Sequence, residues 1–431
     1  MTTTETDSRR LRLGTRGSRL ALTQSGQVAE ALMAAGGSGA ATAAGKASEG
    51  SGGLGIDLVT VRTDGDGDRT PLRQLGGVGV FAARLRHALL DGEVDLVVHS
   101  FKDLPTQPVE GLKVICVPAR EDPRDALCAR DGLTLADLPE GARVGTGSPR
   151  RAAQLLAARP DLEVVDLRGN VPTRLARVRG LEAVGVGTDE PVAPSRADAA
   201  GDLDAVVLAL SGLRRLGLEH CASEVLDLET MLPAPAQGAL AVEARAGEDC
   251  TELARAVAAL DDEPTRLAVT AERALMARLG AGCAAPVGAW AHLRGGSQEP
   301  REEHAEHGTG WNEGFRGDDT AVTGGRQGAG AANGGPRPVG VSEVGPHGTA
   351  ASRRSPRVLV LRAVVTSLDG GQEVGCELST ELPETSGGPG TPGDTAAVRA
   401  AEALGARAAE VLLDDGADQI VDLHANKPRR D

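Results

Sequence analysis

Apolar and polar positions in the first hundred residues alternate between the period of a strand and the period of a helix. Short apolar runs typical of strands lie at 11–14, 56–62 and 94–99, and helical periodicity fills 20–34 and 80–90 between them. The last run, VDLVVH, is rich in β-branched residues, like strands buried on both faces of a parallel sheet. This β–α–β–α–β order predicts a doubly wound α/β layer.

The same alternation begins again near residue 142 and changes character near residue 260. The second set of predicted strands and helices is, in order, 142–145, 150–158, 162–167, 173–178 and 204–209. The third set begins with a helix and contains two strands and a closing helix: 263–279, 287–293, 357–367 and 395–413. We therefore expect two doubly wound, periplasmic-binding-protein-like α/β domains, with ligands at the carboxyl ends of their strands, and a smaller α+β domain.

These patterns predict domain limits. The first α/β domain is expected at 1–118, with 238–258 returning to it, the second at 119–237, and the α+β domain at 259–431. Three stretches of low hydrophobicity are interpreted as inserted surface loops: 36–55, 183–201 and 295–355.

Composition narrows the possible partners. The 431 residues include three Phe, two Trp and no Tyr, so aromatic platforms for single-stranded nucleic acid are scarce. A net charge of −15 disfavours nucleic acid and anionic membranes, although arginines can still converge on a small anion. No apolar run reaches the ~18 residues of a membrane span, and the polar first ten residues lack a signal-peptide core. We expect a cytoplasmic monomer.

The six cysteines are scattered without a Cys-x-x-Cys pair, which disfavours a disulfide framework and a structural zinc site. We expect no metal. Most of these cysteines are expected to be small buried hydrophobic residues.

Two junctions between a predicted strand and the next helix combine a hydroxylated or small residue with arginine. Ser18 can cap the helix that follows it, and Arg16 lies close to the positive end of that helix. In LRGNVPTR (167–174), Arg168 and Arg174 surround a similar turn.

A third junction, GTGSPRR (145–151), has the same composition. Ser148 suits a helix N-cap, so free backbone N–H groups and the side chains of Arg150 and Arg151 can bind an anion. A single arginine of this kind is more often solvated. Three such junctions at the ends of strands favour a ligand with several carboxylates or phosphates.

Two further residues carry candidate chemistry, and the residues alone leave both open. Asp103 follows the strand at 94–99 and is either an ion-pair partner of Lys102 or a group that exchanges protons with a substrate and stabilises a developing cation. Cys283 lies in the Gly-flanked turn LGAGCAAPVG (279–288). A lone cysteine is most often inert and buried, whereas a thiolate that faces an arginine-rich cleft is nucleophilic.

Eight segments, taken together and in order, resemble those of the porphobilinogen deaminase family. They are RGS (16–18), HSFKD (99–103), EDPRD (121–125), GTGSPRR (145–151), LRGN (167–170), GLRRLG (212–217), PAQG (235–238) and GC (282–283). The resemblance covers most of 11–293 apart from two insertions, and 357–423 more loosely.

The resemblance implies the chemistry. Four porphobilinogen molecules are deaminated and joined head to tail into hydroxymethylbilane, which passes to the next tetrapyrrole enzyme. The chain grows on a dipyrromethane cofactor that is attached covalently to the loop cysteine, here Cys283.

The resemblance also implies residue roles. Asp103 matches the catalytic Asp, which assists loss of ammonia and stabilises the resulting azafulvene cation. The positions that match cofactor-binding residues are Ser100, Lys102, Thr146, Ser148, Arg150, Arg151 and Gln237. Those that match substrate-binding residues are Arg16, Ser18, Arg168, Arg174, Arg215 and Phe81.

The sequence departs from the family in one loop, where Gln74 and Val78 stand in place of lysines that many relatives carry. Two alternatives to the enzyme are a two-lobed α/β binding protein and a degenerate deaminase that binds tetrapyrroles without making them. The Gly-flanked cysteine in a third domain disfavours the first, and the presence of both Asp103 and Cys283 disfavours the second.

Overall fold

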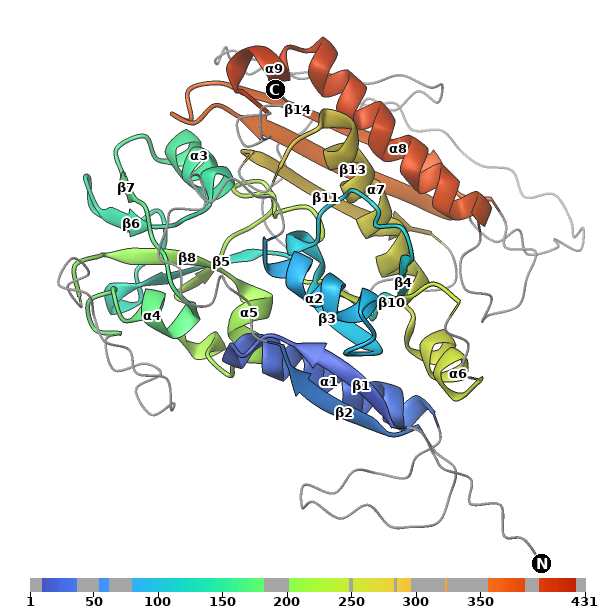
Figure 1. Ribbon diagram of the computed structural model, residues 1–431. Helices are drawn as coiled ribbons and strands as arrows, with labels where there is room; N and C mark the ends of the chain where they lie inside the picture. The colour runs from blue at the N-terminus through green and yellow to red at the C-terminus, as the bar shows by residue number, and fades with distance from the viewer. Residues whose placement is uncertain are drawn as a thin grey trace, which may run out of the picture.

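The structure is a computed structural model, and it describes residues 10–36, 54–61, 80–181, 201–247, 251–282, 285–295, 322–323, 356–383 and 395–423. The strands of these residues form three sheets, and helices pack against each of them (Figure 1). No helix among the described residues combines the length and the apolar character needed to cross a membrane.

The first sheet has the strand order β2-β1-β3-β10-β4. Its strands are β1 (Leu11–Thr15), β2 (Ile56–Thr60), β3 (Leu96–Ser100), β4 (Leu112–Cys116) and β10 (Leu240–Arg245). β1 pairs in parallel with β2 and β3, whereas β10 runs antiparallel to β3 and β4. The helices are α1 (Arg19–Ala35), α2 (Val80–Leu90) and α6 (Thr251–Leu260), with the short 3₁₀ helix η2 (Phe101–Asp103) after β3.

The second sheet repeats this plan with the order β7-β6-β8-β5-β9. Its strands are β5 (Asp125–Ala129), β6 (Arg143–Gly145), β7 (Glu163–Val165), β8 (Ala205–Ala209) and β9 (Glu224–Val225). β6 is parallel to β7 and β8, and β5 runs antiparallel to β8 and β9. The helices are α3 (Pro149–Ala158), α4 (Val171–Leu175) and α5 (Leu210–Arg215), with 3₁₀ turns η3 (Arg130–Gly132) and η4 (Glu219–Cys221).

Both sheets therefore have three parallel strands followed by an antiparallel strand, β10 in the first sheet and β5 in the second. In the first sheet this strand, β10, comes from after the second sheet, so the chain crosses between the two lobes twice. The two repeated lobes confirm the predicted fold class of two doubly wound α/β layers with a smaller third unit. The limits of the three domains stay a prediction.

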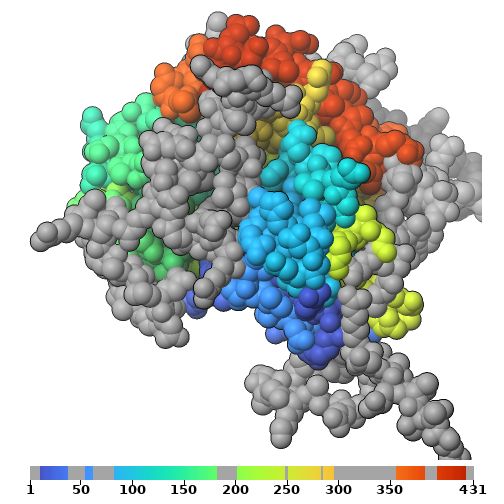
Figure 2. All heavy atoms as spheres, in the orientation of Figure 1, coloured from blue at the N-terminus to red at the C-terminus, as the bar shows by residue number. Residues whose placement is uncertain are grey.

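The third sheet has the order β11-β13-β14-β12. It consists of β11 (Val287–Arg294), β12 (Val322–Thr323), β13 (Val358–Thr366) and β14 (Glu373–Glu381), and it lies against α7 (Glu263–Leu279) and α8 (Thr395–Asp414), with α9 (Ala417–Ile420) after α8. In Figure 2, α8 runs along the top of the molecule, above the first lobe. Gly405 of α8 lies against the backbone of α7, where a Cβ would collide with the carbonyl oxygen of Ala271.

The boundaries of several elements differ from the predictions for local reasons. The helices expected at 80–90 and 263–279 are confirmed at those limits. The helix expected at 173–178 instead occupies Val171–Leu175, because the Asn170 side chain accepts a hydrogen bond from the Thr173 N–H and so starts the helix earlier. The strand expected at 162–167 is shortened to Glu163–Val165.

Candidate functional site

The turn after β3 places Lys102 and Asp103 at the carboxyl end of a parallel strand. Phe101 is buried beneath this turn, and Asp103 is exposed. Ser100, at the end of β3, donates a hydrogen bond of 3.1 Å to Gln24 Oε1 on α1. Lys102 Nζ donates to Gln237 Oε1 at 3.2 Å, so its hydrogen bond goes to the other lobe rather than to Asp103.

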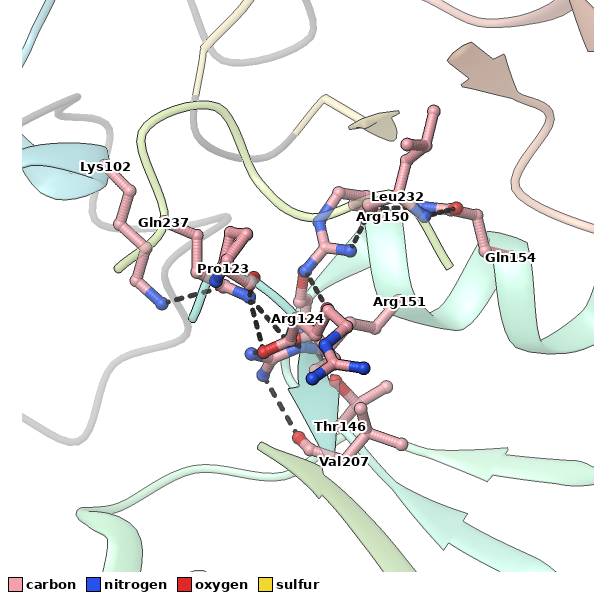
Figure 3. Close-up of polar contacts among 12 residues, drawn as sticks. Lys102, Pro123, Arg124, Thr146, Arg150, Arg151, Gln154, Val207, Leu232 and Gln237 are labelled. Atoms are coloured by element: carbon pink, nitrogen blue, oxygen red, sulfur yellow. Dashed lines mark hydrogen bonds and ion pairs between the residues drawn. The ribbon is translucent and has the colours of Figure 1, made fainter. Parts of the chain in front are cut away.

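Gln237 joins the two lobes at one buried point. Its side chain is fully buried, and its Nε2 donates to the carbonyl of Pro123 at 2.7 Å and to Asp125 Oδ1 at 2.8 Å. Because Oε1 accepts from Lys102, one amide connects η2 of the first lobe to β5 of the second (Figure 3). The structure thus places Gln237 at the crossing between the sheets.

Asp125, the first residue of β5, is the centre of the predicted arginine pair. It is 0% exposed and accepts hydrogen bonds from Arg150 at 2.8 Å and from Arg151 at 2.7 and 3.0 Å. The two guanidinium groups keep the pKa of the Asp125 carboxyl well below its usual range, although burial acts in the opposite direction. Sequence reasoning gave Asp125 no role, and an acid inside the apolar strand DALCA was the signal available.

Each arginine of this pair also donates to a backbone carbonyl. Arg150 donates to Leu232 at 2.6 Å, and Arg151 donates to Val207 at 3.1 Å. Arg150 Nε is buried and has no hydrogen-bond partner among the described residues. A buried N–H without an acceptor is costly, so this atom marks a place where an anionic ligand or a water fits.

The turn before α3 holds these arginines in place. Gly147 lies so close to the Leu167 carbonyl oxygen that a Cβ has no room, and the buried Thr146 hydroxyl accepts a hydrogen bond from the Ser148 N–H at 3.2 Å. Ser148 occupies the N-cap position, as predicted, but its side chain makes no capping hydrogen bond. Its hydroxyl is therefore not used to cap the helix.

The turn before α4 brings more positive charge to the same region. Arg174 Nε donates to the Gly169 carbonyl at 2.7 Å. Burial, followed by the charges of Arg151 and Arg168, lowers the pKa of Arg174 to about 10, while Asp103 acts in the opposite direction. Asp166 also raises the pKa of Arg174, so positive and negative groups of both turns act on this guanidinium.

The remaining predicted cations and hydroxyls lie on neighbouring elements. Ser18 caps α1 as predicted, accepting from the Ala21 N–H at 3.3 Å, and the half-buried Arg16 lies between β1 and this cap. Arg215, at the end of α5, donates to the Gly238 carbonyl at 2.7 Å, and burial lowers its pKa.

Lys102 is another cation with a lowered pKa at the junction of the two lobes. Burial lowers the pKa of Lys102 to about 8, Asp103 and Asp125 raise it, and Arg150 and Arg151 lower it. Several buried or half-buried cations with lowered pKa values repel one another and become more stable when an anion binds. The site is thus suited to a small molecule with several negative charges.

Several predictions concern residues that the structure does not describe, among them most of the inserted loops expected at 36–55, 183–201 and 295–355. Cys283 and the loop with Gln74 and Val78 are among the residues that the structure does not describe, and Phe81 is described only as part of the backbone of α2. The four cysteines that it does describe are buried: Cys116, Cys128, Cys221 and Cys376. Burial raises the pKa of each of these thiols, which makes them inert, as the sequence predicted.

A buried ion pair between Arg120 and Glu272 holds the backbone on either side of Gln237. Arg120 donates to both oxygens of Glu272 on α7, at 2.7 and 3.0 Å, and its Nε donates to the Gln237 carbonyl at 2.7 Å. Glu272 also accepts from the N–H groups of Ala236, at 2.5 Å, and of Ala291 on β11, at 2.8 Å. The third unit is therefore attached directly to the backbone that positions Gln237.

Fold and site together define a class: a two-lobed α/β protein with a cationic site at the junction of its lobes and an exposed carboxylate, Asp103, beside it. Residues 11–252 match the family domain described as "Porphobilinogen deaminase, dipyromethane cofactor binding domain", and 266–298 match the C-terminal domain of the same family. The chain belongs to the porphobilinogen deaminase family.

Individual relatives agree. A porphobilinogen deaminase of Cutibacterium acnes is 45% identical over 421 residues, covering 97% of this chain and 99% of that protein. One from Micrococcus luteus is 56% identical over 300 residues, covering 66% and 74%. Among solved structures, a nutrient-binding protein from Burkholderia cenocepacia bound to methionine covers 57% of this chain and 90% of its own, with 14% identity and a TM-score of 0.32, too low to support any argument.

Proposed function

We propose that this chain joins four porphobilinogen molecules head to tail into hydroxymethylbilane, with release of one ammonia for each, on a dipyrromethane cofactor bound to the sulfur of Cys283. The chain is thus a transferase of tetrapyrrole biosynthesis, and the match of 11–252 to the cofactor-binding domain of the family makes dipyrromethane its cofactor. The observation that carries the proposal is the set of buried cations around Asp125, opposite Asp103.

The residues present fit the cofactor and the growing product. Each pyrrole carries an acetate and a propionate, so both are polyanions. Arg150 has a buried Nε–H that finds no acceptor in the described part of the chain, and the pKa values of Lys102 and Arg174 are lowered by burial and by neighbouring positive charges. Carboxylates placed here satisfy the donor and neutralise the repulsion.

We assign the cofactor carboxylates to the inner part of this set: Ser100, Lys102, Thr146, Ser148, Arg150, Arg151 and Gln237. We assign the substrate carboxylates to Arg16, Ser18, Arg168, Arg174 and Arg215, and a packing role beside the pyrroles to Phe81. When bound, the cofactor supplies the pyrrole carbon to which the first substrate is joined.

We assign the chemistry of ammonia loss to Asp103. As an exposed carboxylate at a strand end, it can accept hydrogen bonds from the pyrrole N–H groups of the substrate. Positive charge develops on the substrate as the C–N bond breaks and ammonia leaves. A fixed negative charge stabilises that cation until the unsubstituted carbon of the last pyrrole of the bound chain attacks it, after which the same carbon loses its proton.

We further propose that the chain acts as a cytoplasmic monomer and passes its product to the next tetrapyrrole enzyme. Few large apolar side chains are exposed among the described residues, which supports a monomer: Leu22 on α1, Leu58 on β2, Leu90 at the end of α2 and Leu368 after β13.

The mass of the intact protein tests whether the dipyrromethane cofactor is attached to Cys283. The purified chain should be heavier than its sequence by two linked pyrrole units, and the excess should map to the peptide that contains Cys283. The variant Cys283→Ala should have the bare mass, whereas Cys221→Ala, which alters a buried thiol, should keep the excess. A bare mass for the active chain, or an excess that persists in Cys283→Ala, contradicts the proposal.

A further inference from the structure

Arg273 connects α7 to the turn that carries Asp103. One of its terminal nitrogens donates to the carbonyls of Phe101, at 3.2 Å, and Leu104, at 2.6 Å, and the other donates to the carbonyl of Pro105, at 2.8 Å. The same guanidinium lies over the Phe101 ring, 4.5 Å from its centroid. A single side chain of the third unit thus holds both ends of the segment 101–105.

The three hydrogen bonds from Arg273 supply donors to carbonyl groups that have few partners within the η2 turn itself. A single 3₁₀ turn such as η2 leaves carbonyls at its end without partners, because few residues follow in helical conformation. In η2 the Phe101 carbonyl accepts only the Leu104 N–H within the turn, at 3.2 Å. A planar guanidinium offers several donors in fixed directions and stacks on an aromatic ring, so arginine suits this position better than lysine.

Apolar packing on the same helix face supports the arrangement. Val269, one turn before Arg273, belongs to a buried cluster with Phe101 and Leu104. Asp103 itself is exposed, so α7 packs against the buried side of the turn while the Asp103 carboxylate remains accessible. The hydrogen bonds that Arg273 makes to this turn go to main-chain carbonyls and not to the residues that we assign to substrate.

The other end of α7 leads to the cofactor-bearing cysteine. The helix ends at Leu279 with Gly280 in the left-handed conformation (φ 63°), and Cys283 follows three residues later. Arg273 therefore connects the helix that leads to Cys283 with the turn that presents Asp103.

We propose that Arg273 is a positioning residue for the reaction: it fixes the turn that carries Asp103 and keeps Asp103 in register with the segment that leads to Cys283. This inference rests on the proposed role of Asp103. A carboxylate that stabilises a transient cation must be held within a fraction of an ångström, and a displacement near 1 Å can lower a rate about 100-fold.

The test compares Arg273→Met and Arg273→Lys with the unaltered enzyme, using only protein that carries the full cofactor mass. We expect Arg273→Met to lower kcat about 10- to 100-fold with KM for porphobilinogen changed less than about two-fold, because substrate contacts are kept while the carboxylate moves. Arg273→Lys should recover part of kcat. Arg278→Met is the matched control, since Arg278 is an exposed arginine of the same helix that pairs with Glu410, and its kcat should be unchanged.

A double-mutant cycle with Asp103→Glu shows whether Arg273 acts through Asp103. If it does, Arg273→Met should lower kcat far less in the Asp103→Glu enzyme than in the unaltered enzyme. Equal effects in both backgrounds overturn the inference, as does an unchanged kcat, or a raised KM with kcat unchanged, in Arg273→Met. An unchanged kcat in Asp103→Glu alone also overturns the inference, because the carboxylate then needs no fixed position, whereas near-normal turnover in Asp103→Asn removes the role proposed for Asp103 itself.

If Arg273→Met does not fold or load its cofactor, Arg273→Lys and Phe101→Leu carry the test. Phe101→Leu removes the ring under the guanidinium and leaves the three carbonyl acceptors. A lowered kcat with unchanged KM in these two variants supports the inference, and an unchanged kcat in both overturns it.

Discussion

At the scale of single residues, Asp125 determines what the arginine pair can do. Its carboxylate accepts from both Arg150 and Arg151, so it orients two guanidinium groups and neutralises one of their two charges. The sequence predicted the arginines from the turn that precedes them. It could not predict their counter-ion, because Asp125 lies 25 residues before Arg150 and only strand pairing brings the two together.

Asp103 is best tested by removing its charge while keeping its shape. Asp103→Asn should lower kcat about 100- to 10,000-fold, because a neutral amide stabilises a developing cation poorly, while the intact mass should still show the cofactor. Steady-state rates of hydroxymethylbilane formation and the mass of the same sample measure both.

The matched control is Asp131→Asn. Asp131 also lies in a 3₁₀ turn directly after a strand, is exposed, and has a positive φ of 57° that asparagine tolerates well. Its rate should stay within about two-fold of the unaltered enzyme. Near-normal turnover in Asp103→Asn would show that another group carries the reaction.

At the scale of elements, the sequence predicted parallel strands and long helices better than antiparallel strands. Strand β10 was not predicted, because its sequence LAVEAR places the charged Glu243 in its middle. In the structure Glu243 is buried and accepts from Arg86 at 2.9 Å, and its Oε2 lies 3.1 Å from His99 Nε2, which compensates for its charge. Arg86 of α2 and His99 of β3 allow a buried carboxylate in this strand. Both are distant in sequence, so the local pattern around Glu243 cannot predict them.

The turn before α3 gives an element-scale prediction. Gly147→Ala should push the turn away from the Leu167 carbonyl oxygen and displace Arg150 and Arg151 at the start of α3. We expect unfolding by denaturant to require about 1–3 kcal/mol less free energy, and a smaller fraction of chains to carry the cofactor mass.

Gly26→Ala in the middle of α1 is the control for this substitution. A Cβ at Gly26 has nothing within 4 Å, and alanine favours a helix by about 1 kcal/mol over glycine. This variant should be as stable as the unaltered chain or more so. If Gly147→Ala behaves like Gly26→Ala, the close approach at Leu167 has no influence on the site.

At the scale of the whole molecule, the chain crosses twice between two lobes of the same design, and Gln237 lies at the second crossing. Lys102 comes from the first lobe, and Asp125, Arg150 and Arg151 come from the second. The site therefore exists only when both lobes are folded and docked. Burial at this junction lowers the pKa of Lys102, and charges from both lobes modify it further.

Because burial where the two lobes meet lowers the pKa of Lys102, we expect cofactor binding to depend on pH. An exposed lysine has a pKa near 10.4, and burial lowers that of Lys102 to about 8, so its positive charge is present below pH 8 and is lost as the pH rises through that value. The rate at which the apo-chain acquires its cofactor from porphobilinogen, measured by intact mass, should fall across this range. In Lys102→Arg the fall in this rate should move to higher pH. Lys113→Arg, which changes an exposed lysine, should have the same pH profile as the unaltered chain. A flat profile for the unaltered apo-chain contradicts this role.

The sequence by itself determined the two α/β lobes, the third unit and most of the residue types of the site, because strand and helix periods and turn residues are local properties. Asp103, Ser18, Thr146 and the arginines could be found in this way. The tertiary structure decided their partners: Asp125 between Arg150 and Arg151, Gln237 between Lys102 and Asp125, and Arg273 behind Asp103. Such contacts join residues 25 to 172 positions apart, and only the folded arrangement of the sheets brings them within hydrogen-bonding distance of each other.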